Sequence, residues 1–386
     1  MLVSDIPIHA AHHNPHGIAV QFHDRSMTYA ALRDDCWRLA NALLEFAEAG
    51  DRVAILAENC PEYALCYYGV PAAGMALTLL NYRLAPGELA YIIGDAAPTV
   101  LVVEDKFLGR IESIRDLIPS VRTVVVIGAG APAPHVIAFD ALLARGRPQP
   151  PARAVAEDAL AWLLYTSGTT GLPKGVMLSH RNVMAAVLNS LVSWDRQADD
   201  TVMMMTFPMY HVAGYGMLIS HLRAVKLVLM QNFDPETLFA TIQNYRVTAT
   251  SAAPTMIAML LNHPARENYD LGSFANIGYG ASAMPVAVLR RAREFWPQVR
   301  FTTGFGMTEL AGNVMVLTAD EHVRAADAGL AILGSVGRQM ALAMVRVVDD
   351  ADRDVAPGED GEIIVKGDQV LSGYWRNPEA TAKAIV

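Results

Sequence analysis

The stretch Leu164-Tyr165-Thr166-Ser167-Gly168-Thr169-Thr170-Gly171-Leu172-Pro173-Lys174-Gly175 decides how the rest of this sequence is interpreted. The apolar run Ala159 to Leu164 predicts a strand before the loop, and Val176-Met177-Leu178 predicts a strand after it. Between the two strands lie three glycines, four aliphatic hydroxyls and one lysine. Such a loop can direct backbone N–H groups, hydroxyl donors and a positive charge toward one anion. The composition therefore favours binding of a triphosphate.

The loop differs from a Walker A sequence. Lys174 follows Gly171 after two intervening residues, and Gly175 stands where a Walker A loop has the Ser or Thr that holds Mg²⁺. A plain glycine-rich hairpin is the alternative interpretation. The density of hydroxyls together with the lysine favours phosphate binding over that alternative.

The segment Tyr165 to Lys174 resembles the phosphate-binding signature of the adenylate-forming (AMP-binding) superfamily, which includes acyl-CoA synthetases, luciferases and adenylation domains of peptide synthetases. Thr28-Tyr29, Gly50-Asp51-Arg52-Val53 and Asn81-Tyr82-Arg83-Leu84 resemble the first third of that superfamily, in its fatty acyl-CoA ligase branch. The resemblance covers essentially the whole chain. It implies that Lys174 is catalytic, that Thr166 contributes to a magnesium site, and that the nucleotide phosphates contact Thr166, Ser167, Gly168, Thr169, Thr170, Gly171 and Lys174.

A second segment, Thr302 to Glu309, is similar to the family pattern of Gly, aromatic residue, Gly, hydrophobic residue, Thr and Glu. The resemblance implies that Phe305 stacks on adenine and that Thr308 offers its hydroxyl to the α-phosphate. Glu309 then gives a hard oxygen ligand to Mg²⁺. The wider nucleotide site is Gly304, Phe305, Gly306, Met307 and Thr308, with Thr308 and Glu309 catalytic. The alternative is a plain turn that starts a helix at Thr308.

Two further segments complete the expected site. Gly280-Ala281-Ser282 approximately matches a family segment of small residues against which adenine lies, so a nucleotide role is expected for all three. Pro208 to Gly214 resembles the family motif beside the carboxylate substrate, which places Tyr210, His211, Val212 and Gly214 at the acyl group. A buried core histidine is the alternative for His211. General-base duty is unnecessary there, because a carboxylate is already ionised at neutral pH.

Regular alternation of predicted strands and helices predicts an α/β fold with mostly parallel sheets. We expect two stacked α/β parts, about 1–160 and about 161–330, the second with the nucleotide and acyl sites, and a β-rich part at about 331–386. Two helix starts are also predicted: Thr28 caps a helix from Tyr29 to about Ala49, and Asn59 caps the next helix, with Pro61 in its first turn.

Composition narrows the classes of partner and site. The net charge of −9 offers no basic patch, which argues against a nucleic-acid partner. Cys36, Cys60 and Cys66 lack metal-ligand spacing and indicate a reduced, cytoplasmic setting. The uncharged stretch Tyr63 to Leu80 is interpreted as a buried helix and strand, because its glycines and proline argue against a membrane span. A solvated N-terminal helix, not a metal site, accounts for His9, His12, His13 and His16.

These observations predict ATP-dependent activation of a carboxylic acid, expected to be a fatty acid, to an acyl-adenylate and then an acyl-CoA. ATP, Mg²⁺ and coenzyme A are the expected cofactor and co-substrates. In the superfamily a ribose-binding Asp and a mobile C-terminal domain follow the segment that ends at Val386, so we expect this chain to lack full turnover. The alternatives are a non-catalytic nucleotide- or acyl-binding homologue and an aryl acid–CoA ligase. Peripheral membrane association and oligomeric state stay open.

Overall fold

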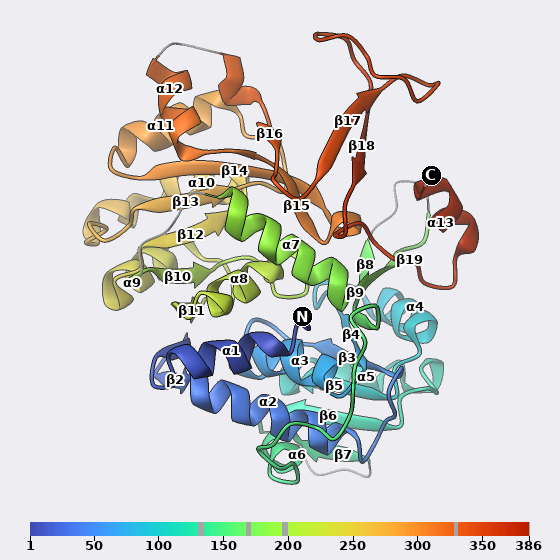
Figure 1. Cartoon of the computed structure of the whole chain (residues 1–386). Coiled ribbons are helices and arrows are strands. Elements are labelled where there is room, and N and C mark those ends of the chain that lie inside the picture. Colours follow the sequence, from blue (N-terminus) through green and yellow to red (C-terminus); the bar gives the residue numbers. More distant parts are fainter. Residues whose placement is uncertain (130–134, 167–170, 195–199, 328–330, 386) are drawn as a thin grey trace.

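The computed structural model describes residues 1–129, 135–166, 171–194, 200–327 and 331–385. Two large sheets organise the described residues (Figure 1). The order of the nine-stranded sheet is β16 (Arg338–Gln339), β15 (Gly312–Leu317), β14 (Arg300–Met307), β13 (Asn276–Tyr279), β12 (Ala249–Ala252), β10 (Val202–Met205), β11 (Lys226–Leu229), β1 (Ile18–Phe22) and β2 (Arg25–Thr28). Its strands from β14 to β1 pair in parallel, and β15, β16 and β2 are antiparallel to their neighbours.

The second sheet has eight strands. Its order is β19 (Gly373–Tyr374), β9 (Lys174–Ser179), β8 (Leu160–Thr166), β4 (Ala76–Leu79), β3 (Arg52–Leu56), β5 (Val100–Glu104), β6 (Thr123–Ile127) and β7 (Val136–Ala138). The β8–β9 and β9–β19 pairs are antiparallel, and the other pairs are parallel. The predicted fold class is thereby confirmed. Each sheet takes strands from both sides of residue 160, since β1 and β2 join the first sheet while β8 and β9 join the second.

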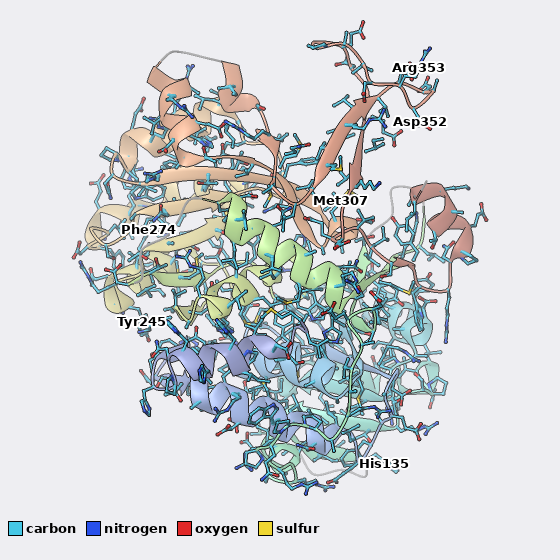
Figure 2. All side chains as sticks on the ribbon, viewed as in Figure 1. His135, Tyr245, Phe274, Met307, Asp352 and Arg353 are labelled. Carbon is cyan, nitrogen blue, oxygen red and sulfur yellow. The ribbon has the colours of Figure 1, made fainter. Side chains whose placement is uncertain are left out.

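A small antiparallel pair, β17 (Met344–Val348) and β18 (Glu362–Lys366), forms the third sheet. It projects from the body of the molecule, and Asp352 and Arg353 lie in its connecting loop (Figure 2). The helices are α1 (Asp5–His13), α2 (Tyr29–Leu43), α3 (Pro61–Ala72), α4 (Pro86–Ala96), α5 (Leu108–Glu112), α6 (Phe139–Leu143), α7 (His180–Ser193), α8 (Gly216–Leu222), α9 (Pro235–Tyr245), α10 (Pro254–Asn262), α11 (Val286–Phe295), α12 (Ala319–Asp327) and α13 (Pro378–Ala384).

The largest hydrophobic cluster joins the two sheets through helices α1, α2, α3, α7 and α8. Helix α3 is buried from Pro61 to Pro71, which explains why the stretch Tyr63 to Leu80 is uncharged. That stretch forms α3 followed by β4, as the sequence predicts. In the part of the chain that the structure describes, no helix combines the length and the apolar character needed to cross a membrane.

Two helix caps test the local predictions. The Thr28 hydroxyl accepts a hydrogen bond from the Ala31 N–H at 3.2 Å, so that cap is confirmed. Helix α2 ends at Leu43, short of Ala49, because i to i+3 hydrogen bonds close its last turn at Glu45 and Phe46. The prediction for Asn59 was wrong, because Cys60 occupies the N-cap position of α3 and the Asn59 side chain bonds a distant loop.

Candidate active site

The described ends of the predicted phosphate loop form the hairpin that the sequence indicates. Thr166 at the end of β8 is the register partner of Lys174 at the start of β9. Among the described residues, no atom lies within 4 Å of a Cβ added to Gly171, so packing against them does not explain why a glycine stands there. Ser167, Gly168, Thr169 and Thr170 lie outside the described residues, and their contacts with phosphate stay a prediction.

Lys174 and Glu309, which come from the two separate motifs, meet at one tyrosine. The Lys174 ammonium lies 5.0 Å from the centroid of the Tyr374 ring, and the Tyr374 hydroxyl donates to Glu309 Oε1 at 2.9 Å. Strand β19 holds Tyr374 there by pairing with β9, and the Leu371 N–H donates to the Glu309 carbonyl at 2.8 Å. Burial and the neighbouring Glu309 carboxylate raise the pKa of Tyr374 to about 12, so this hydroxyl remains a donor at neutral pH.

The donor chemistry here fits a magnesium ion that arrives with a nucleotide. Glu309 supplies a carboxylate with one oxygen bonded by Tyr374, and Thr166 supplies a hydroxyl beside Lys174. Mg²⁺ prefers oxygen ligands and is commonly held by one or two protein groups together with substrate phosphates and water. Among the described residues, no group of three or more His, Cys, Asp or Glu side chains could form an all-protein metal site.

A cavity of about 640 Å³ joins the other motifs. Its lining comes from the ends of β12, β13 and β14, from the segment after β10, and from helices α1, α7 and α8. The predicted residues in its wall are His211, Val212, Gly280, Ala281, Gly304, Gly306 and Met307. Thr308 and Glu309 follow Met307 directly in a short 3₁₀ turn (Thr308–Leu310) and are half-buried.

Close backbone approach explains two of the glycines. A Cβ added to Gly280 would lie 2.6 Å from the Gly304 carbonyl oxygen, and one added to Gly306 would lie 1.9 Å from that of Gly312. A side chain at either position would require the backbone to shift. This part of the wall is therefore bare backbone, a flat surface that suits a planar ring.

Hydrogen bonds from Asn59 and Tyr67 hold the segment that carries His211 in place. Asn59 Oδ1 accepts from the Met209 N–H at 2.7 Å, and Asn59 Nδ2 donates to the Phe207 carbonyl at 3.0 Å. The Tyr67 hydroxyl donates to the Met209 carbonyl as well. These long-range bonds hold both ends of the turn that leads to His211.

His211 itself is set up as a neutral donor. Its Nδ1 accepts from the Ala213 N–H at 3.1 Å, so in the neutral ring the proton resides on Nε2. Desolvation by the surrounding protein lowers the pKa of His211, although the residue is exposed to the open volume of the cavity. The ring stacks on Phe207 with centroids 6.4 Å apart. His211 can therefore donate a hydrogen bond to a carboxylate in the cavity.

Four predicted site residues lie elsewhere. The Phe305 side chain packs on Leu310, Val314 and Ala343 outside the cavity, and the Tyr210 ring packs edge-on against Tyr82 with centroids 5.3 Å apart. Gly214 is in the core, where an added Cβ would lie 2.0 Å from the Tyr67 hydroxyl oxygen. Ser282 is exposed and does not line the cavity. Sequence reasoning missed several residues at the site: Asn59, Tyr374, His9, His13 and Arg223.

Comparison with known proteins agrees with this geometry. Residues 8–375 match the family model described as AMP-binding enzyme. The chain belongs to this family. It is 32% identical over 386 residues to feruloyl-CoA synthase of Amycolatopsis sp, covering 98% of this chain and 72% of that protein. It is 31% identical over 366 residues to long-chain-fatty-acid–CoA ligase of Thermus thermophilus, covering 93% of this chain and 66% of that protein.

The fold of this AMP-binding family member also matches solved structures. The inhibitor-bound N-terminal domain of FACL13 from Mycobacterium tuberculosis superposes with a TM-score of 0.88 at 28% identity. The match covers 100% of this chain and 94% of that domain. The two-sheet architecture with its small antiparallel pair is thus the fold of the adenylate-forming N-terminal domain.

Proposed function

We propose that this chain activates a fatty acid with ATP to an acyl-adenylate, whose acyl group then passes to coenzyme A in the cytoplasm. The observation that carries the proposal is the single cavity that joins the bare backbone of Gly280, Gly304 and Gly306 to the His211 segment. An acyl-adenylate needs both surfaces at once, because it joins a planar base to an apolar chain through one phosphate. The relatives, which are acid–CoA ligases by name, support the same reaction.

The reaction requires positioning and charge stabilisation more than proton transfer. A carboxylate oxygen attacks the α-phosphorus, and the bond to the bridging oxygen breaks as pyrophosphate leaves. The thiol sulfur then attacks the acyl carbon, AMP leaves, and the thiol proton passes to solvent. No base is needed in the first step, because the acid is already ionised. Preorganised donors at the sites of developing charge account for most of the rate in such reactions.

Each described residue has a place in that scheme. Neutral His211 donates to the substrate carboxylate and orients it, while Lys174 offers positive charge beside the phosphate loop. Tyr374 fixes the Glu309 carboxylate. Glu309 and Thr166 would hold Mg²⁺, which supplies charge against the phosphate oxygens. Thr308, in the turn after Met307, offers its hydroxyl to the α-phosphate.

The acyl end of the cavity favours an apolar chain. Met203, Phe207, Val212, Ile219 and Leu222 line it, and none of the described lining residues is acidic. Methionine and aliphatic side chains adapt to a flexible chain. An aryl acid is the second candidate, since Trp194 and Phe207 also line the cavity and one relative is a feruloyl-CoA synthase.

A thermal-shift screen of acids with and without MgATP tests this function. We expect MgATP and a fatty acid together to raise the melting temperature more than the sum of the two alone, because each ligand fills part of one cavity. If neither nucleotide nor any acid changes the melting temperature of the protein, the proposal is contradicted. Larger shifts with hydroxycinnamates than with fatty acids would favour the aryl candidate.

A further inference from the structure

The turn that leads to His211 is bonded at both backbone polar groups of one buried residue, Met209. The Met209 N–H donates to Asn59 Oδ1 at 2.7 Å, and the Met209 carbonyl accepts from the Tyr67 hydroxyl. Within the turn, the His211 N–H donates to the Pro208 carbonyl at 3.1 Å. A displacement of Met209 would therefore move His211 as well.

Both anchoring side chains come from another part of the fold. Asn59 lies between β3 of the eight-stranded sheet and helix α3, and Tyr67 lies within α3, whereas the turn follows β10 of the nine-stranded sheet. Asn59 Nδ2 also donates to the Met230 carbonyl at 2.9 Å, directly after β11. The Tyr67 ring packs against Trp162 of β8, with centroids 4.8 Å apart. Asn59 is 2% exposed and Tyr67 is fully buried, so packing fixes both anchors.

His211, in contrast, is exposed to the cavity. Its Nδ1 accepts from the Ala213 N–H, and its ring stacks on Phe207. These two contacts orient the ring relative to its own segment of the chain. The bonds from Asn59 and Tyr67 fix that segment relative to the rest of the cavity wall.

We propose that Asn59 and Tyr67 are positioning residues for the acid, which hold His211 where its Nε2–H meets the substrate carboxylate. This inference rests on the proposed acid-activating function and adds two residues that act only through His211. Neither is among the described residues that line the cavity. A hydrogen bond weakens steeply as its geometry departs from the optimum, so a small displacement of the turn should lower the affinity for the acid.

Helix α3 offers a matched control for Tyr67. Tyr63 lies one turn earlier and is also fully buried, but its hydroxyl has no hydrogen-bond partner in the part of the chain that the structure describes. Tyr67→Phe and Tyr63→Phe therefore remove the same group from the same helix, and only the first removes a bond to Met209.

Isothermal titration compares these two variants with the wild type. The probes are AMP and the saturated fatty acid, of eight to sixteen carbons, that binds the wild type most tightly. We expect Tyr67→Phe to bind the acid about threefold more weakly, because one neutral hydrogen bond to the turn is lost. Tyr63→Phe should bind the acid as the wild type does, and both variants should bind AMP unchanged.

A double-mutant cycle with His211→Ala distinguishes positioning from a general loss of packing. His211→Ala should weaken acid binding about tenfold, and Tyr67→Phe should have no further effect in that background. Asn59→Ala should weaken acid binding about fivefold, and this loss should also disappear without His211. Asn41→Ala is its control, since the Asn41 amide likewise bonds three backbone groups but lies on α2, and it should leave acid binding unchanged.

The His211 ring gives a second readout that needs no acid. In ¹⁵N NMR spectra, with the ring signals assigned by their loss in His211→Ala, Tyr67→Phe should shift these signals and Tyr63→Phe should not. An unchanged melting temperature is the evidence of folding, and Tyr67→Phe carries the test if Asn59→Ala does not fold.

Three results would overturn the inference while the proposed function stands: equal acid binding by Tyr67→Phe and the wild type, an equal loss in the His211→Ala background, or unchanged ring signals in Tyr67→Phe. Failure of every acid to bind the wild type would remove the proposed function and this inference together.

Discussion

Substitution Tyr374→Phe isolates the hydroxyl that links the two motifs. Phenylalanine keeps the ring that lies 5.0 Å from the Lys174 ammonium and removes only the donor to Glu309 Oε1 at 2.9 Å. Without this hydrogen bond the Glu309 carboxylate is no longer held in place, so it must become ordered when Mg²⁺ and nucleotide bind. We therefore expect weaker magnesium-dependent binding of ATP, with little change in fold.

The magnitude follows from the partners. A hydrogen bond to a charged group contributes about 1.5–3 kcal/mol. Tyr374 is 9% exposed and Glu309 is half-buried, so water replaces part of the lost bond. A net loss of about 1.4 kcal/mol corresponds to roughly tenfold weaker binding.

Isothermal titration with ATP, with and without magnesium, is the assay. A double-mutant cycle with Glu309→Gln tells a positioning role from a general packing role, because the hydroxyl should matter only while the carboxylate is present. The expected coupling is that Tyr374→Phe has little further effect in the Glu309→Gln background. An equal loss in both backgrounds, or in the absence of magnesium, would refute the reasoning.

Three further predictions concern the metal, the acid and pH. Glu309→Gln should lower acid-dependent pyrophosphate exchange by orders of magnitude while the melting temperature is kept, and unchanged exchange would contradict the role of Glu309. Fatty acids should raise the melting temperature more than benzoates or amino acids do, and a larger shift with an aryl acid would contradict the fatty-acid assignment. Burial lowers the pKa of His221 from 6.5 to about 4, and its ring nitrogens face the Tyr68 hydroxyl and the Ala19 carbonyl. The unfolded chain then binds the proton first as pH falls, so stability should decrease between pH 6.5 and about 4 by roughly 1.4 kcal/mol per pH unit. Calorimetry of His221→Gln should show a smaller decrease, and an identical pH profile would contradict it.

Local patterns predicted what depends on local structure. The alternation of strands and helices gave the fold class, and the cap at Thr28 is present because its hydroxyl accepts a hydrogen bond from a backbone N–H three residues away. The hairpin at Thr166 and Lys174 follows from two apolar runs around a glycine-rich loop. All of these features involve residues that are close in sequence.

The site required information that local patterns do not contain. Tyr374 reaches Glu309 across 65 residues, and Asn59 reaches Met209 across 150. Phe305 illustrates a different problem. Its position in the motif indicated an aromatic platform, whereas in the structure the ring packs against the small apolar cluster of Leu310, Val314 and Ala343 and does not line the cavity. The pairing of β14 with β15 shifts register between Phe305 and Gly306, an irregularity that the motif does not reveal.

The central claim is that one cavity binds nucleotide and acyl chain together, and binding of a stable acyl-adenylate mimic tests it most directly. Isothermal titration would compare a fatty acyl-sulfamoyl adenosine with AMP and with the free fatty acid. Because the mimic fills both surfaces after a single loss of translational freedom, it should bind at least about a hundredfold more tightly than either part. A mimic that binds no more tightly than AMP would show that the two surfaces do not form one site.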